Sequence, residues 1–525
     1  MSKDIGFAMN NVAQTVVSPI NADATTKRGG GSNQLTFAGV IVSQKGKPFE
    51  VLRVTDANLT DVLGKPFHSS LGVHADGMRT LAEALKGGDG LVVRVVPATA
   101  TFPAIKVTKP ADKLVFTNEA IAYSADLDLG SGEFLALAIK DGAESANRSV
   151  SIESVDEKLY GKGMLKLTLK ETQEAGGKAT LEEWIVSFDP EAKDQMGATA
   201  YIETVLEQKS KYLSCVCDAA TAKAELTAMA ETAFTGASNG DLSAIKTSDY
   251  DAAITALRST VLGFNYICGL SCYDDAVTKK LQKLSDDRRI SGYYDINPRL
   301  THAQALAHKQ GLNLACHRAS YVHLPYAAKC PTYKNKCPWG ASGIAFAAKA
   351  LGVSKTSPTG GWHYTPAGVE RAVISRAGLT PLRGSGEPNF EEMYKARLNK
   401  LGVSENGALF IDDSLTSTPV ENYLRFEQVV SVTDAISRDF VALANRIKHR
   451  PDDDTEKAIE DGMTAIFEGY ETVGALVAPR DPEQDGESPW TFEIIQVEID
   501  LWKVTWSICP TGSGRRLIGE PILVR

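Results

Sequence analysis

The 525-residue sequence has no apolar run close to the ~20 residues that cross a bilayer, and even the compact run Val92–Val96 is interrupted by Arg94. The start, MSKDIGFAMNN, lacks the apolar core of a signal peptide. Positive charge is also scarce, since 56 Lys and Arg face 65 Asp and Glu, for a net charge of -9. This acid excess disfavours binding to nucleic acid or to an anionic membrane surface. We therefore expect a protein made and folded in a cytosol, with no nucleic-acid partner and no membrane insertion.

The signatures of common enzyme sites are missing as well. No G-x-x-x-x-G-K-[ST], strand-linked G-x-G-x-x-G, G-x-S-x-G or H-E-x-x-H occurs. Asp295 in YYDINP and the pair Asp412 and Asp413 in ALFIDDS follow expected strands, where α/β enzymes place catalytic acids. Carboxylates at strand ends also cap helices and turns. Asp295 and Asp412 are thus the candidate acids if the chain is an enzyme, but we predict no catalytic residue and no cofactor.

The eight cysteines show no C-x-x-C spacing. Cysteine and histidine do cluster in one short span, which makes a zinc site conceivable. The members of that cluster are Cys316, His317, His323, Cys330 and Cys337. Small buried thiols in a reducing compartment are the interpretation we prefer, and we predict no bound metal.

The length predicts more than one domain. Residues 1–33, which end in NADATTKRGGGSN, are typical of an arm and a flexible linker. Segment 34–100 alternates strand and helix patterns and starts an α/β core domain. Short strands separated by Gly, Asp and Asn predict an inserted all-β outer domain over 101–195. The α/β pattern resumes over 196–480, and 481–525 carries C-terminal strands and a second arm.

Helix signals support this division. A short helix is expected to end at Gly64, and a second one carries Met78, Leu81, Ala82 and Leu85 on one face. Two long helices close the core. The first is predicted to start at Thr433 and Asp434 and to stop at Pro451, and the second starts at about Thr455. The buried stripe of the second helix is Ile459, Met463, Ile466, Tyr470 and Val473.

The C-terminal block TFEIIQVEIDLWKVTWSIC alternates between apolar and polar residues, and then changes phase at Trp502. A phase change within a strand predicts a bulge or a bend. After the turn PTGSG comes one more strand-like segment, and both chain ends have the character of strands without an obvious partner. We expect these arms to pair with other subunits. Their apolar residues are Ile5, Phe7, Val12, Val16, Leu517, Ile518, Ile522 and Val524.

Taken in order, the motifs resemble those of the contractile tail sheath proteins of bacteriophages and related injection machines. LTFAGVIVSQKGKPFEVLRVTDANLTDVLG and GMRTLAEALKGGDGLVVRVVP are similar to the opening of that family. DDRRISGYYDINP, SYVHLPYAAKCPTYKNKCPWGASGIAFAAKALG, GGWHYTPAGVERAV and the RF-x-x-VV block match later elements. The resemblance covers the chain except Thr101 to Asp189. One departure is RIKHRPDDD, which stands where many relatives carry Phe-x-Pro-Asn.

The resemblance implies a structural function. Sheath subunits stack as six-fold rings around a tail tube, in an extended metastable state, and contract to drive the tube through the host envelope. Arms at both ends add strands to the sheets of neighbours. The implied partners are copies of this chain, the tail tube protein, and baseplate and tail-terminator proteins. The implied location is the virion tail, assembled in the host cytoplasm.

The resemblance also implies a helix near the C-terminus that faces the tube. On the helix expected over Thr433–Arg450, the basic residues share one flank, and we assign the tube-facing surface to Arg438, Arg446, His449 and Arg450. A solvated basic edge that complements the C-terminal end of the helix is the alternative. Two other functions stay open, namely an α/β enzyme and a non-contracting virion structural protein.

Overall fold

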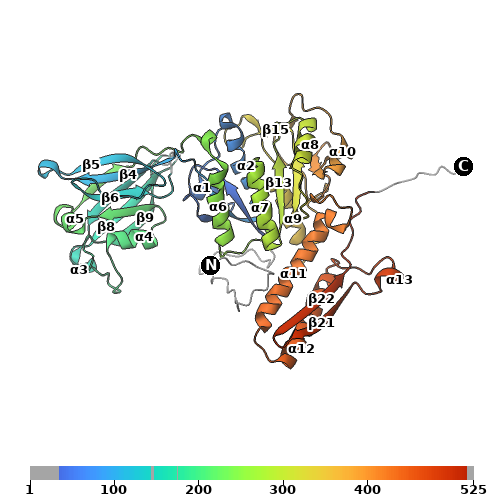
Figure 1. Cartoon of the computed structure of the whole chain (residues 1–525). Coiled ribbons are helices and arrows are strands. Elements are labelled where there is room, and N and C mark those ends of the chain that lie inside the picture. Colours follow the sequence, from blue (N-terminus) through green and yellow to red (C-terminus); the bar gives the residue numbers. More distant parts are fainter. Residues whose placement is uncertain (1–34, 143–146, 174–175, 517–525) are drawn as a thin grey trace.

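The computed structural model describes residues 35–142, 147–173 and 176–516. Figure 1 shows a β-rich unit, a central unit built on one large sheet, and a C-terminal unit of two long helices and a hairpin. The chain is therefore a mixed α/β protein, as its sequence predicts. Within the described residues, no helix combines the length and the apolar character needed to cross a membrane.

The central unit contains a seven-stranded sheet. Its strands, in spatial order, are β18 (Leu398–Asn399), β14 (Ala319–His323), β13 (Ser291–Ile296), β12 (Tyr266–Cys268), β1 (Leu35–Ile41), β3 (Gly88–Arg94) and β2 (Val51–Val54). All neighbours pair in parallel except β2 and β3. The long apolar runs of β1 and β3 follow from this topology, because parallel strands are covered on both faces.

Helices cover both faces of the central sheet (Figure 1). One face carries α2 (Gly77–Ala84) and α9 (Ser342–Val353), and the other carries α6 (Thr247–Ser259), α7 (Asp275–Arg288) and α8 (His302–Gly311). The predicted helix at Met78 is α2, and its buried face includes Met78 and Leu81. A Cβ atom on Gly343 of α9 would lie 2.2 Å from the Thr80 carbonyl oxygen, so glycine is required for α2 and α9 to pack this closely.

The β-rich unit has two four-stranded sheets. One has the order β10 (Leu213–Cys217), β6 (Glu133–Ile139), β4 (Thr101–Thr108), β5 (Val115–Ala122). The other has the order β11 (Met229–Ala233), β7 (Arg148–Ser154), β8 (Leu165–Thr172), β9 (Lys178–Val186). Both sheets share one apolar core with α4 (Ile202–Lys209) and α5 (Ala219–Glu225).

The predicted boundary at residue 195 therefore does not match the strand pairing. β10 pairs with β6 and β11 with β7, so the unit continues until Ser238 pairs with Thr101. The sequence prediction assigns α4 to the α/β core, because this helix falls within 196–480 and its local pattern is helical. Its apolar face instead packs on the β sheets, through Ile202 and Leu206. Below, "outer β unit" means the described residues of 101–238.

Shorter elements complete the central region. The small sheets are formed by β16 (Lys336–Pro338), β15 (Tyr326–Lys329) and β17 (Thr380–Pro381), and by β19 (Leu401–Val403) and β20 (Leu409–Ile411). The short helices of the central region are α1 (Leu59–Leu63) and α10 (Phe390–Lys395), whereas α3 (Glu157–Tyr160) belongs to the outer β unit and α13 (Pro482–Asp485) to the C-terminal unit. α1 ends at Gly64 with φ 77°, a left-handed value that favours glycine, as the sequence predicts.

Two long helices, α11 (Glu427–Ile447) and α12 (Asp452–Thr472), lead into the C-terminal unit. The predicted start of α11 at Thr433 is wrong by six residues, because Asp434 is not a cap. Asp434 is buried within the helix and pairs with Arg318, at 2.7 and 2.8 Å. The buried stripe of α12 is confirmed, with Met463 and Tyr470 almost fully buried.

The C-terminal block folds as a hairpin of β21 (Trp490–Glu498) and β22 (Leu501–Ile508), not as one strand. The register shifts between Gln496 and Glu498, so the hairpin contains a bulge, but this bulge lies before the phase change at Trp502. The change of phase at Trp502 has another cause, because a tight turn at Ile499 and Asp500 separates the two strands. A reversal of direction and a bulge give the same signal in a list of apolar positions.

Candidate assembly surface

The hairpin is held to the long helices by its inner face. Phe467 of α12 is fully buried, and its ring stacks on Trp490 and Phe492 with centroid distances of 5.2 and 5.9 Å. Phe440 of α11 lies 5.2 Å from Trp506. Aromatic pairs at these distances add to the stability gained from burial. The hairpin is therefore a fixed part of the C-terminal unit.

The outer edges of this hairpin have no strand partner within the described residues, because β21 and β22 pair only with each other. Its tip is also apolar and open to solvent, with Ile495, Val497 and Ile499 exposed by 42, 51 and 86%. An open edge presents unpaired main-chain groups that can pair with a strand from another chain. The hairpin thus offers two places for strand addition.

The helix α11 joins this unit to the central sheet. Its first part is buried in the central unit, where Glu427 accepts hydrogen bonds from the hydroxyl groups of Tyr266 (3.1 Å) and Tyr293 (2.8 Å). Its second part packs against α12 through Leu443 and Ile447. One continuous helix thus has buried contacts in both units, which favours their movement as one body.

The four residues that we assigned to the tube-facing surface lie in two environments. Arg438 is half-buried, with its guanidinium 5.0 Å from the centre of the Trp362 ring and a hydrogen bond of 3.0 Å to the Arg289 carbonyl. Arg446, His449 and Arg450 are exposed at the end of α11 and in the loop after it. The proposed surface therefore rests on these last three residues, and Arg438 has a packing role.

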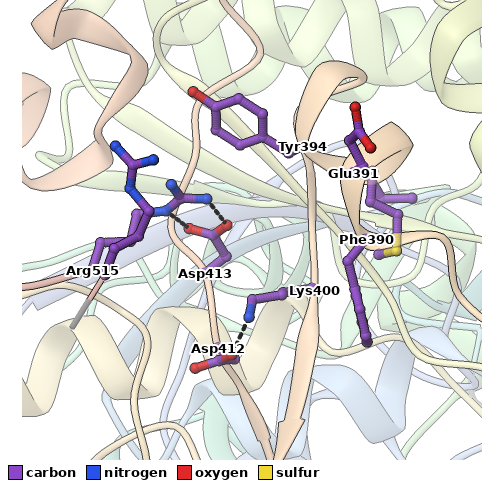
Figure 2. Close-up of a pocket in the computed structure, with 10 residues that line it drawn as sticks. Phe390, Glu391, Tyr394, Lys400, Asp412, Asp413 and Arg515 are labelled. Atoms are coloured by element: carbon purple, nitrogen blue, oxygen red, sulfur yellow. Dashed lines mark hydrogen bonds and ion pairs between the residues drawn. The ribbon is translucent and has the colours of Figure 1, made fainter. Parts of the chain in front are cut away.

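The eight arm residues that we predicted lie outside the described residues, in 1–34 and 517–525. The described chain ends at Arg515 and Arg516, which line a pocket of about 280 Å³ beside the edge strand β18. Figure 2 shows the Arg515 guanidinium facing the Asp413 carboxylate across this pocket. Nε and Nη2 donate to the two carboxylate oxygens at 2.7 and 2.6 Å. The sequence pattern did not reveal this contact, because the two residues are far apart in the chain.

The candidate acids have structural partners. Asp295 is buried at the end of β13, where its carboxylate accepts from the backbone of Ser271, Ala341 and Ser342 and from the Ser342 hydroxyl, at 2.5–3.1 Å. Burial raises the pKa of the Asp295 carboxyl, and these hydrogen bonds oppose the rise. Asp412 forms an ion pair with Lys400 at 2.7 Å. Asp295 thus connects two strand ends to the start of α9, which is the capping role considered above.

The Cys and His residues of the conceivable zinc site do not converge. In the part of the chain that the structure describes, no three Cys, His, Asp or Glu side chains are placed to hold a metal ion. Cys316 lies near Asp286, whereas Cys330 accepts a hydrogen bond of 3.3 Å from Arg79 in a separate apolar cluster. All eight cysteines are free thiols.

A buried charge network joins the outer β unit to the central unit. Arg94, at the end of β3, donates to the carbonyl oxygens of Ser43, Gly46 and Asp141 and to the Asn239 side chain, at 2.7–3.0 Å. Arg94 therefore contacts the outer unit at Asp141 and the chain connection that follows it at Asn239. The sequence contained a signal for this role, because one arginine within a buried apolar strand needs several acceptors.

No model of a known protein family matches the chain, and no curated protein sequence matches it. Solved structures of contractile injection systems are similar to it in structure. The chain is 12% identical to a chain of the anti-feeding prophage baseplate, with a TM-score of 0.41 over 54% of this chain and 75% of that one.

Two sheath structures in the contracted state are similar to the same degree. The sheath complex of the extracellular contractile injection system PVC is 12% identical, with a TM-score of 0.40 over 52% of this chain and 74% of that one. The helical sheath of the anti-feeding prophage is 12% identical, with a TM-score of 0.41 over 53% of this chain and 76% of that one.

Proposed function

We propose that this chain is the structural subunit of a contractile tail sheath. The observation that carries the proposal is the hairpin of β21 and β22, which is firmly packed on one face and, among the residues that the structure describes, unpaired along both edges. The order of the sheath-like motifs along the sequence supports it independently. In this proposal the two arms, residues 1–33 and the segment after Arg516, add strands to hairpins of neighbouring subunits.

Strand addition suits a lattice that changes shape. Each donated strand forms several main-chain hydrogen bonds, each worth about 0.5–1.5 kcal/mol net, and buries apolar side chains as well. A head-to-tail contact of this kind generates helical filaments when its rotation does not close. The subunits can then rotate as rigid bodies during contraction while the strands keep them connected.

The remaining surfaces follow from this arrangement. We place Arg446, His449 and Arg450 toward the tail tube and the outer β unit on the outside of the sheath. The expected partners are further copies of this chain, the tube protein, and the baseplate and terminator proteins at the two ends of the tail. The expected location is the virion tail, after assembly in the host cytoplasm.

The alternatives have less support in the geometry. An enzyme that uses Asp295 would have to free a carboxylate that already accepts four hydrogen bonds. A non-contracting virion protein would share the open hairpin, and it would differ only in having a single state of assembly.

Electron microscopy of the purified chain at high concentration tests the proposal. A sheath subunit forms long hollow tubes, and an enzyme forms discrete particles. Deletion of residues 1–20, or of all residues from Leu517 onward, should leave a folded subunit that no longer forms tubes. The second deletion keeps Arg515 and its contact with Asp413. Normal tubes from both deletion variants would refute strand exchange.

A further inference from the structure

The segment that follows the hairpin is fixed to the protein at two places. After β22, the Thr511 backbone N–H donates to the Ala475 carbonyl at 2.9 Å, which holds the chain to the C-terminal unit. Arg515 then binds Asp413 of the central unit through two hydrogen bonds of 2.7 and 2.6 Å. Between these points run Gly512, Ser513 and Gly514, which are exposed. The segment is therefore a strap across two units.

The central end of the strap is a built site. The Asp413 side chain is only 5% exposed and accepts a further hydrogen bond of 2.9 Å from the Ser414 backbone. The Arg515 guanidinium also lies 4.9 Å from the centre of the Tyr394 ring. Two parallel hydrogen bonds and an aromatic face fix the position of an arginine more closely than a single charge contact does.

The same contact can open without disturbing the core. The Arg515 side chain is 27% exposed, and a Cβ atom built on Gly512 would meet nothing within 4 Å. Among the described residues of the strap, Arg515 alone binds the central unit through its side chain. Solvent therefore reaches the pair, and a competing contact can replace it.

We propose that Arg515 and Asp413 form a releasable latch that sets the point at which the C-terminal segment leaves the subunit. This inference rests on the proposed function, in which that segment is an arm. With the latch closed, the arm starts beside the edge strand β18. With the latch open, Thr511 is the last fixed residue, and residues 512–515 lengthen the arm by about 14 Å at ~3.4 Å per residue.

The added length gives the latch its role. Neighbouring subunits change their spacing when a lattice contracts, and an arm that stays paired must span the larger distance. A latch that opens under this load supplies length from the strap, so the strand pairing itself is not pulled apart. The closed latch keeps the arm short before that point.

Distance measurements on the free subunit test the latch. Spin labels are attached through encoded ketone residues at Arg516 and at the exposed loop residue Glu405, because eight native cysteines rule out thiol labelling. The wild type should give a narrow distance distribution. The distance distribution of R515Q should be at least twice as broad. That of R515K should have an intermediate width, because lysine keeps the charge but cannot form the paired hydrogen bonds.

Two further variants decide the outcome. D413N should broaden the distribution in the same way as R515Q, because it opens the latch from the other side. K400Q is the matched control. Lys400 lines the same pocket but pairs with Asp412, so this variant removes a charge and should leave the width of the distance distribution unchanged. A narrow distribution in both R515Q and D413N overturns the latch. Tube formation is scored separately, so a wild type that forms no tubes refutes the sheath function while the distances still report on the latch.

Discussion

The Lys349 ammonium nitrogen lies 3.1 Å from a carboxylate oxygen of Glu427, and the two side chains are 0 and 1% exposed. Lys349 also donates to the carbonyl oxygens of Trp362 (2.7 Å) and Tyr364 (2.9 Å). Burial lowers the pKa of the Lys349 ammonium, and the Glu427 carboxylate opposes that effect. This pair ties α9 to the start of α11 and so connects the central sheet with the C-terminal unit.

Replacement of Lys349 by Met should destabilise the central unit strongly. The variant leaves the Glu427 carboxylate buried without a charged partner, which typically costs about 3–5 kcal/mol. Urea unfolding of the free subunit measures the loss. K355M is the control, because Lys355 is 40% exposed and its ion pair with Glu370 is long, at 3.9 Å. The double variant K349M/E427L should recover most of the loss, and a double variant less stable than K349M would contradict this account.

The stability of the central unit should fall in mild acid because of His323. This residue ends β14, is 1% exposed, and lies 3.2 Å from the Leu300 carbonyl oxygen through Nε2. Burial holds the pKa of His323 at about 3, below the usual 6.5. At a pH between these two pKa values, His323 of the unfolded chain binds a proton that His323 of the folded chain does not. The free energy of unfolding therefore decreases as the pH falls.

From pH 7 to pH 5 this single group should remove about 2 kcal/mol of unfolding free energy. H323Q should not show this loss of unfolding free energy between pH 7 and pH 5. The control H449Q, which changes an exposed histidine, should show the same loss as the wild type. Urea unfolding at the two pH values provides the measurement. An H323Q variant with the wild-type pH dependence would show that the pKa of His323 is the same in the folded and the unfolded chain.

The outer β unit should be removable if it is cut at the boundary that the structure shows. Thr101 and Ser238 exchange two backbone hydrogen bonds of 2.9 Å, so a short Gly/Ser linker can replace residues 101–238. We expect a soluble product that keeps the thermal transition of the central unit.

Removal of 101–195 alone is the matched comparison. It should give an insoluble product, because it exposes the apolar faces of α4, β10 and β11 that pack in the outer core. The two products are compared by solubility and by thermal unfolding. If the larger deletion also aggregates, the outer unit is needed for the central unit to fold.

Charge reversal at the end of α11 should weaken assembly around the tail tube. R446E/R450E changes exposed residues, so the fold and the formation of empty tubes should persist. Exposed ion pairs contribute only about 0.2–1 kcal/mol each, and the loss should therefore be clearest at low salt. Co-assembly with the tube protein, followed by sedimentation, measures it.

R438E is the informative contrast. This change disrupts the contact with Trp362 and should lower stability, without a specific effect on binding to the tube. Unchanged co-assembly of R446E/R450E at low salt would remove this flank of α11 from the tube-facing surface.

Local patterns identified the elements that depend on local physics. The helix stop at Gly64 follows from the left-handed backbone that glycine permits, and the stripe of Ile459, Met463 and Tyr470 follows from helical periodicity. The α/β class followed from the alternation of strand and helix signals. The order of the motifs indicated the sheath resemblance, whereas the arms on which strand exchange depends lie outside the described residues.

Contacts between distant residues decided the rest. Asp434 has the residue type of a helix cap, yet its partner Arg318 is 116 residues away, and this pairing places it inside α11. α4 has an ordinary helical pattern, and only the outer sheets that it covers assign it to the β-rich unit. The sequence alone determined which faces are apolar, because periodicity is a property of neighbouring residues. Only the tertiary structure decided which faces meet, because the free energy of each contact depends on partners that are remote in the chain.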